Sequence, residues 1–293
     1  MAEFIKTVWS DKIAQALRED PDLNSMFSRD LEPYVRAQGG NAIVLPSLSA
    51  NSSFQRTDNK TIGAGLPLTT VDIAKTGQTL NIYEYTYGPI LLRKIDDIQA
   101  NDSLLNKHVV EIKQAAKEYI FTSAVTHVIN NVHADNKKQW TGGVGGAEFA
   151  FADLRAMRKA LSKKKVLTNN RFLAMDSDVE DFLAKDDYLK NWFAVNQQVV
   201  QSGEMPSLSG FKINPTVLVP LTKADGTISA VPGDNVKLTV AGWRKDHMNL
   251  VIQTELEITG SEVAGLIGFE AAFTIRYGLL LDKTEAGVIS TQQ

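Results

Sequence analysis

The most regular hydrophobic pattern in the chain lies between residues 103 and 133, which include no Gly or Pro. Apolar side chains recur every three or four positions, at Leu105, Val109, Ile112, Ala116, Tyr119, Ile120, Val125, Val128, Ile129 and Val132. This spacing predicts a helix with one apolar face, and Asn101 or Asp102 can cap its start. At about 1.5 Å per residue the helix would be roughly 45 Å long. We expect it to be a structural spine.

The segment from residue 39 to residue 90 has a different character. Strand-like runs interrupt a largely polar sequence at residues 42–45, 69–73 and 80–87. We expect Pro46 to end the first run and Gly77-Gln78 to form a turn between the other two. A two-stranded ribbon is marginally stable alone in water. The segment is therefore either a mobile surface hairpin or an arm stabilised by lying on another subunit, and the residues alone leave both open.

The rest of the chain predicts short helices and strands in irregular order. Leu154, Met157, Ala160 and Leu161 share one helical face, which predicts a helix over residues 149–162. Two more helices are expected at residues 10–18 and 179–183, the latter capped by Asp176 or Ser177. Strands are expected at residues 172–175, 210–219, 236–243, 250–258, 269–281 and 288–289. Regular βαβ alternation is missing, so the fold class is α+β.

The composition is that of a folded protein of one large domain or two ordinary ones, with 43% apolar and 22% charged residues among 293. A net charge of −3 argues against the basic footprint that drives non-specific DNA binding. The absence of cysteine excludes disulfides and thiolate chemistry. No signal peptide or membrane span is expected. We therefore predict a soluble protein made in a cytoplasm.

Gly142 to Gly146 precedes a predicted helix and invites a nucleotide-binding interpretation. Phosphate-cradling loops, however, follow a strand and lead directly into a helix. Here a long helix and a polar stretch come first, and no Gly-Lys-Ser/Thr occurs. A flexible connector is the favoured interpretation.

The ionisable residues assemble no recognisable reaction centre. The four histidines, His108, His127, His133 and His247, lack metal-binding spacing. The acid pairs Asp96-Asp97, Asp176/Asp178 and Asp186-Asp187 are better explained as helix caps and surface charge. No Gly-x-Ser-x-Gly elbow is present. We predict a protein that is not an enzyme and has no cofactor, metal or catalytic residue.

The order of segments resembles the major capsid proteins of tailed bacteriophages with the HK97 fold, in the branch of P22-like coat proteins. The most specific likeness is Ile95-Asp-Asp-Ile-Gln99, where the family's extended E-loop returns to the spine helix. Other segments that carry the resemblance are residues 9–17, 39–46, 80–87, 172–179, 209–214 and 269–278. The likeness covers nearly the whole chain, and the order of the segments is more specific than any one of them.

This resemblance implies an HK97-like fold with four parts. They are an N-terminal arm at residues 1–38, an E-loop at 39–92, a peripheral domain at 93–168 and 250–293 with the spine helix at 103–133, and an axial domain at 169–249. Because the chain begins directly at the arm, a separate scaffolding protein or a segment lost during maturation is expected.

The resemblance also implies a function. Subunits would form hexamers and pentamers that close into an icosahedral shell around phage double-stranded DNA, which is contacted non-specifically. A scaffolding protein, a portal and decoration proteins are the expected partners, and the shell would assemble in the host cytoplasm to become part of the virion. We hypothesise intersubunit ion pairs by Arg56, Lys60, Arg93, Asp96 and Asp97. The alternatives are an encapsulin-type nanocompartment that packages protein cargo and, more remotely, a nucleotide-binding enzyme built around Gly142 to Gly146.

Overall fold

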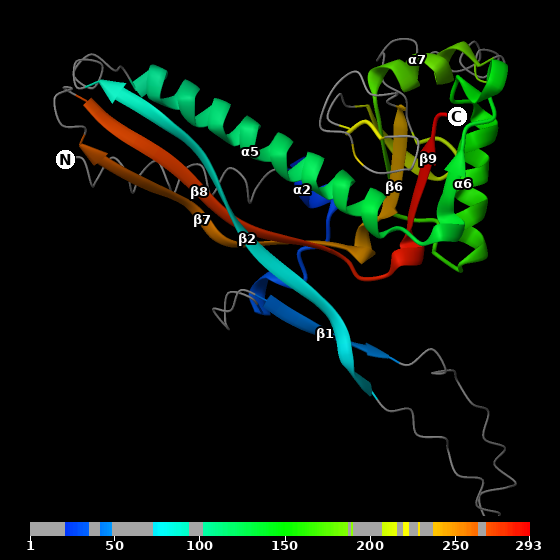
Figure 1. Ribbon diagram of the computed structural model, residues 1–293, viewed down its shortest axis with the longest axis horizontal. Helices are drawn as coiled ribbons and strands as arrows, with labels where there is room; N and C mark the ends of the chain where they lie inside the picture. Colours follow the sequence, from blue (N-terminus) through cyan, green and yellow to red (C-terminus); the bar gives the residue numbers. More distant parts are fainter. Residues whose placement is uncertain are drawn as a thin grey trace, which may run out of the picture.

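The computed structural model describes residues 21–34, 42–48, 73–93, 102–186, 189, 207–215, 219–222, 228, 237–262 and 268–293. Figure 1 shows an elongated body, in which a long helix lies along a sheet, beside a compact unit built on a second sheet. The first sheet has the strand order β1-β2-β8-β7 and is antiparallel. The second has the order β3-β9-β6-β4-β5, with β3–β9 and β4–β5 parallel.

The helices of the described residues are α2 (Pro21–Met26), α5 (Asp102–Asn131), α6 (Phe151–Lys163) and α7 (Ser177–Lys185). The strands are β1 (Ala42–Leu48), β2 (Ile73–Arg93), β3 (Lys137–Gln139), β4 (Arg171–Met175), β5 (Phe211–Pro215), β6 (Thr239–Arg244), β7 (Met248–Glu262), β8 (Gly268–Leu281) and β9 (Gly287–Thr291). Short 3-10 turns are η2 (Ala134–Asn136), η3 (Val144–Gly146), η4 (Lys245–His247) and η5 (Thr284–Ala286).

The long helix predicted from the hydrophobic pattern is confirmed as α5. The side chains of its apolar stripe that are buried in the main core are Ile112, Ile120, Val125, Val128, Ile129 and Val132. Tyr277 of β8 fixes the helix to the sheet, because its hydroxyl donates to Ser123 Oγ at 2.9 Å. The Tyr85 ring of β2 stacks on Tyr277 with centroids 4.5 Å apart. These contacts make α5 and the sheet one body.

The turn predicted at Gly77-Gln78 is wrong, since β2 runs without a break from Ile73 to Arg93. Its first part pairs with β1, with Gln78 opposite Leu45, and its second part pairs with β8 from Ile82 onward. Cross-strand hydrogen bonds therefore carry the strand through a sequence that locally favours a turn. Pro46 does not end β1 but lies at its register shift, a place that suits a residue without an N–H.

The free edge of β7 is covered at its start by Ser28, two residues after the end of α2. Ser28 N donates to the Met248 carbonyl oxygen and Leu250 N donates to the Ser28 carbonyl oxygen, both at 2.9 Å. Phe27 stacks on Trp243 with centroids 5.9 Å apart. The N-terminal segment thus protects an edge that could otherwise pair with another chain.

The compact unit has its own core. Leu154, Met157 and Leu161 of α6 pack with β4, whose five side chains are all buried. Asp176 caps α7 as predicted, since its side chain accepts from Asp178 N. The remaining predicted elements in the described residues are present with shifted ends, whereas residues 10–18 lie outside the described residues.

α6 packs on the five-stranded sheet, to which β9 belongs. The C-terminal half of α5 contacts both sheets. The division of the chain into arm, E-loop, peripheral domain and axial domain stays a prediction.

His127 of α5 meets the end of β8 where the two units join. Leu281 N donates to His127 Nε2 at 3.2 Å, so the ring is neutral in this arrangement. Burial lowers the pKa of His127 below its usual value. A lowered pKa means that the neutral ring stabilises the fold above the unfolded-state pKa of about 6.5, and this contribution is lost as the pH falls below it.

We therefore expect the free energy of unfolding in urea to fall between pH 7 and pH 5, and His127→Gln to reduce that fall. The amide oxygen of Gln can accept the same N–H but does not titrate. Comparing the two proteins at each pH cancels the other titrating groups. An unchanged pH profile in His127→Gln would contradict the assignment.

Candidate assembly surfaces

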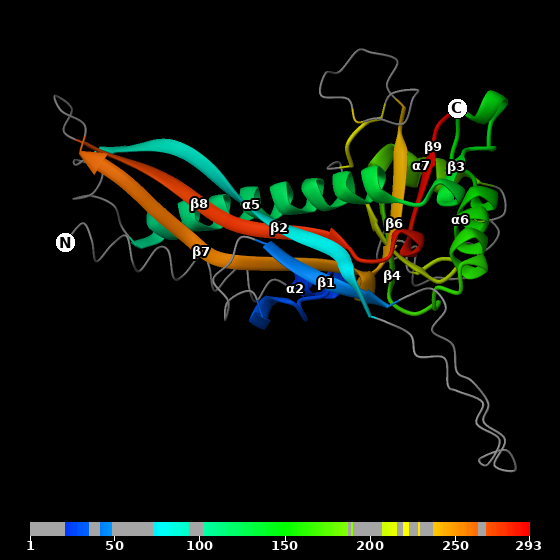
Figure 2. The same cartoon turned by 60° about the horizontal axis from the view of Figure 1, so that its bottom comes forward.

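The ribbon formed by β1 and the first part of β2 projects from the body, as Figures 1 and 2 show. In the four-stranded sheet β1 pairs with β2 alone. Val44 of β1 and Tyr83 of β2 are exposed, at 55% and 58%. Val44 is paired with Thr79, so it lies on the same face as Tyr83. Val44 therefore lies exposed on the two-stranded ribbon, and Tyr83 lies just beyond its base, opposite Tyr277 of β8. Exposed apolar side chains of this kind are candidates for an interaction surface.

Gly278 of β8 sits at the point where β2 changes partner from β1 to β8, because it pairs with Ile82. A Cβ on Gly278 would lie 2.6 Å from the Asn81 carbonyl oxygen and 2.9 Å from Leu80 Cδ2. The base of the ribbon can therefore approach β8 only at a glycine.

We expect Gly278→Ala to cost about 1–3 kcal/mol, as overpacking does, measured by urea unfolding. Since Leu80 and Asn81 lie at the base of the ribbon, Gly278→Ala should also change the angle between the ribbon and the rest of the sheet. If the free energy of unfolding of Gly278→Ala lies within about 0.5 kcal/mol of wild type, the effect of a neutral surface change, the new Cβ fits beside Asn81 and Leu80 without strain and the prediction is wrong.

The five residues hypothesised to make intersubunit ion pairs fall mostly outside the described residues. Arg56, Lys60, Asp96 and Asp97 are in this group, and Arg93 ends β2 with its backbone opposite Gly268. The described sheet instead shows an ion pair within the subunit, between Arg276 Nη2 and Glu84 Oε2 at 2.7 Å. This pair is exposed and contributes at most about 1 kcal/mol.

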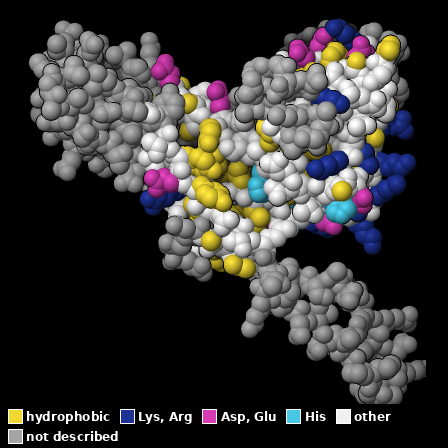
Figure 3. All heavy atoms as spheres, viewed as in Figure 1, with side chains coloured by type: hydrophobic (Ala, Val, Ile, Leu, Met, Phe, Trp, Pro, Cys, Tyr) yellow, Lys and Arg dark blue, Asp and Glu magenta, His cyan; other side chains and the backbone are white. Residues whose placement is uncertain are grey.

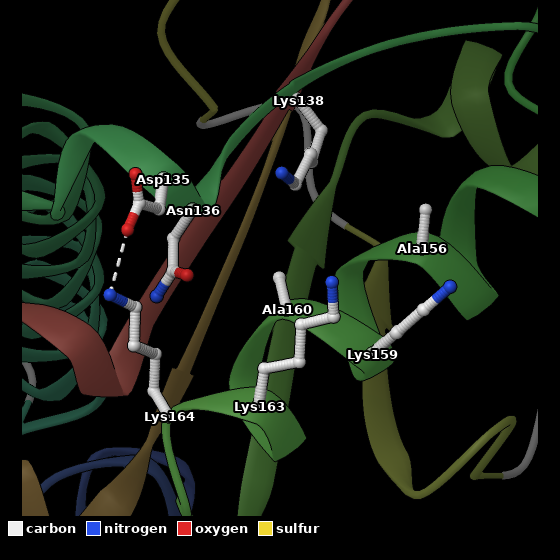
Figure 4. Close-up of a pocket in the computed structure, with 8 residues that line it drawn as sticks. All are labelled: Asp135, Asn136, Lys138, Ala156, Lys159, Ala160, Lys163 and Lys164. Atoms are coloured by element: carbon white, nitrogen blue, oxygen red, sulfur yellow. Dashed lines mark hydrogen bonds and ion pairs between the residues drawn. The ribbon is translucent and has the colours of Figure 1, made fainter.

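A second surface gathers positive charge on the flank of the compact unit. Figure 3 shows Lys and Arg side chains there, over the side that α6 occupies in Figure 1. A groove of about 670 Å³ runs between α6 and the η2–β3 segment. Its walls carry Lys138, Lys159, Lys163 and Lys164, and its remaining lining is Ala156, Ala160, Asp135 and Asn136. We call this the lysine groove (Figure 4).

Sequence reasoning missed the lysine groove because the overall charge is −3. Parallel pairing of β3 with β9 brings the segment around Lys138 beside α6. The signal available in the sequence was the spacing of Arg155, Lys159 and Lys163, which places three cations on one helical face.

The Gly142–Gly146 segment forms a turn, in which Glu148 N donates to the Gly142 carbonyl oxygen at 3.2 Å. Its flexibility as a connector stays a prediction. A Cβ on Gly146, whose φ is +75°, would lie 2.6 Å from the Trp140 carbonyl oxygen. Two carboxylates already occupy the first N–H groups of α6, because Asp153 accepts from Ala150 N and Asp186 accepts from Phe151 N. The start of this helix therefore repels a phosphate. The nucleotide-binding interpretation has no support in this geometry.

Among the described residues, no group of three or more His, Asp or Glu side chains is arranged to hold a metal ion. His247 Nδ1 instead contacts Asp282 Oδ1 at 2.9 Å, beside the turn that joins the two sheets. None of the helices described here has the length and apolar character needed to cross a membrane.

Comparison with solved structures identifies the fold. A chain from Mycobacterium phage Che8 is similar with a TM-score of 0.60 and 14% identity, over 90% of this chain and 89% of that one. The capsid structure of the cyanophage P-SCSP1u is similar with a TM-score of 0.60 and 12% identity, over 86% and 83%. This chain has the HK97-like fold of tailed-phage capsid proteins. The predicted α+β fold of that type is confirmed.

An encapsulin structure is also similar to this chain. The holo-SrpI encapsulin complex from Synechococcus elongatus PCC 7942 is similar with a TM-score of 0.51 and 13% identity, over 75% of this chain and 77% of that one. No family model and no curated protein sequence matches the chain.

Proposed function

We propose that the chain is the major capsid subunit of a tailed bacteriophage, which assembles as hexamers and pentamers into an icosahedral shell around double-stranded DNA. The observation that carries the proposal is the fold, which matches a phage chain and a phage capsid over more than four fifths of this chain. The role is structural, and the described residues offer no reaction centre that would favour an enzyme.

The projecting β1–β2 ribbon supports this function. A two-stranded ribbon gains little stability alone, and stable assemblies bury large, apolar interfaces. Lying on a neighbouring subunit would cover Val44 of the ribbon. The ribbon belongs to the segment at residues 39–92, which is the E-loop of the proposed division, and the spine helix α5 belongs to the peripheral domain.

Placement in the P22-like branch belongs to the same proposal and rests on the resemblance of the segments at residues 9–17 and 39–46. A scaffolding protein, a portal and decoration proteins are the proposed partners.

An encapsulin-type shell is the second candidate, favoured by the structural similarity to the SrpI complex. Electron microscopy of the chain produced alone separates the two. A phage coat without its scaffold forms capsomers, tubes or aberrant shells, whereas an encapsulin closes into uniform particles that retain protein cargo. A discrete small oligomer that binds nucleotide would contradict both.

Intersubunit ion pairs by Arg56, Lys60, Arg93, Asp96 and Asp97 remain part of the proposal. Reversing all five charges is expected to reduce the assembled fraction at least tenfold, measured by sedimentation. Reversal of exposed Glu148 and Lys165, which lie on the compact unit, serves as a control. Normal assembly of the variant with all five charges reversed would show that these residues do not join subunits.

A further inference from the structure

The lysine groove has more positive charge than the subunit neutralises. Lys164 Nζ contacts Asp135 Oδ2 at 2.7 Å, and this contact lowers the pKa of Asp135. Lys138, Lys159 and Lys163 have no ion-pair partner within the part of the chain that the structure describes. Lysine side chains that line one groove repel one another. The groove is therefore suited to carboxylates or phosphates from outside the subunit.

Asn136 narrows the choice of partner. It is 1% exposed, and its Nδ2 donates to the carbonyl oxygens of Glu285 at 2.9 Å and Gly287 at 2.8 Å. Its Oδ1 is buried and receives no hydrogen bond from the described residues. Figure 4 shows this oxygen at the groove, on the side facing α6. A buried acceptor needs a donor, so a well-matched partner brings an N–H or O–H as well as negative charge.

The need for a hydrogen-bond donor to Asn136 Oδ1 favours a protein partner over DNA. The phosphodiester backbone of DNA offers phosphate and sugar oxygens, which are acceptors, and would leave Asn136 Oδ1 without a donor. A protein surface that carries carboxylates also carries hydroxyl and amide donors. The groove therefore favours an acidic protein surface.

The subunit presents such a surface on another side of the compact unit. The first turn of α7 carries Asp178 and Glu180 after the cap residue Asp176, and exposed Ser177 supplies a hydroxyl. Figure 3 shows acidic side chains over the end of the unit where Figure 1 places α7, away from the α6 flank. One copy thus has a cationic groove and a separate anionic helix end.

We propose that the lysine groove of one subunit receives the first turn of α7 from the next subunit in a ring. This inference rests on the proposed capsid function. Rings form through heterologous contacts, in which two different surfaces of each copy meet. Lys159 and Lys163 would face the carboxylates of Asp178 and Glu180. The Ser177 hydroxyl would exchange its long 3.4 Å hydrogen bond to Asp176 Oδ1 for one to Asn136 Oδ1.

A charge exchange tests the pairing. Lys159→Glu with Lys163→Glu, and separately Asp178→Lys with Glu180→Lys, are each expected to lower the assembled fraction at least tenfold. The four changes in one chain are expected to restore assembly to within about twofold of wild type. Arg158→Glu, exposed on α6 but outside the groove lining and off the face shared by Lys159 and Lys163, is the matched control and should assemble normally.

A cross-link provides a measurement that does not depend on charge. The chain has no cysteine, so Lys163→Cys with Asp178→Cys creates one pair. Mild oxidation should give a ladder of covalent oligomers, whereas Arg158→Cys with Asp178→Cys should give none.

The outcomes are distinct. Assembly that is not restored by the exchange, together with absence of the ladder, overturns the contact and leaves the capsid function standing. Normal assembly of the Lys159/Lys163 variant with loss of bound DNA would assign the groove to nucleic acid and also overturn the contact. A wild-type chain that forms no oligomer would overturn both the contact and the proposed function.

Discussion

Replacing Trp243 with Ala is expected to lower the free energy of unfolding by about 3–5 kcal/mol, the usual cost of removing a large aromatic side chain from a core. Trp243 is 1% exposed and lies on β6, in the core shared with α5. Its ring stacks on Phe27 and lies 6.3 Å from Phe121, and its Nε1 donates to the Met26 carbonyl oxygen at 3.0 Å. One side chain therefore joins the N-terminal segment, α5 and the compact unit.

Urea unfolding measures the loss, with Trp243→Phe as the matched variant. Phe keeps the stacking but lacks the indole N–H, so its cost should be well below that of Ala. A loss under 1 kcal/mol in Trp243→Ala would mean that the two units are not held together by this core.

Asp153→Ala is expected to have the second largest effect, about 3 kcal/mol. The carboxylate is 2% exposed and accepts three hydrogen bonds, from Thr141 N at 3.0 Å, Thr141 Oγ1 at 2.6 Å and Ala150 N at 3.0 Å. Removing it leaves buried donors without an acceptor, and hydrogen bonds to a charged group are worth about 1.5–3 kcal/mol each. The turn at Gly142 to Gly146 and the start of α6 should loosen together.

Exposed Asp178→Ala provides the control for Asp153→Ala, because surface substitutions generally change stability by about 0.5 kcal/mol or less. Hydrogen exchange should locate the effect, with faster exchange at Ala150 and Thr141 than in wild type. Equal stability of the two variants would contradict the role of Asp153 as the anchor of this turn.

The elements that could be predicted from the sequence are those whose stability is local. The apolar stripe of α5 extends over some eight helical turns, so its spacing leaves little ambiguity. The cap of α7 by Asp176 depends on residues only two positions apart. In contrast, Gly77-Gln78 looks like a turn until the pairing of β2 with β1 is known, since that pairing places Gln78 opposite Leu45, which is 33 positions away in the chain.

The candidate assembly surfaces were harder to predict because they also depend on contacts between distant parts of the chain. The lysine groove exists because β3 pairs with β9, a contact across about 150 residues that no local pattern reports. Asn136 in the sequence is an ordinary polar residue, and only its buried position gives it a role. The HK97-like fold itself came from the order of the segments and not from any single motif.

Cryo-electron microscopy of particles formed by the purified chain is the decisive test of the capsid function. The capsid function predicts closed or partly closed shells made of rings of five and six subunits, in which the β1–β2 ribbon lies on a neighbouring subunit and Val44 is covered. Monomers or small discrete oligomers at all concentrations, or shells in which the ribbon contacts only its own subunit, would contradict it.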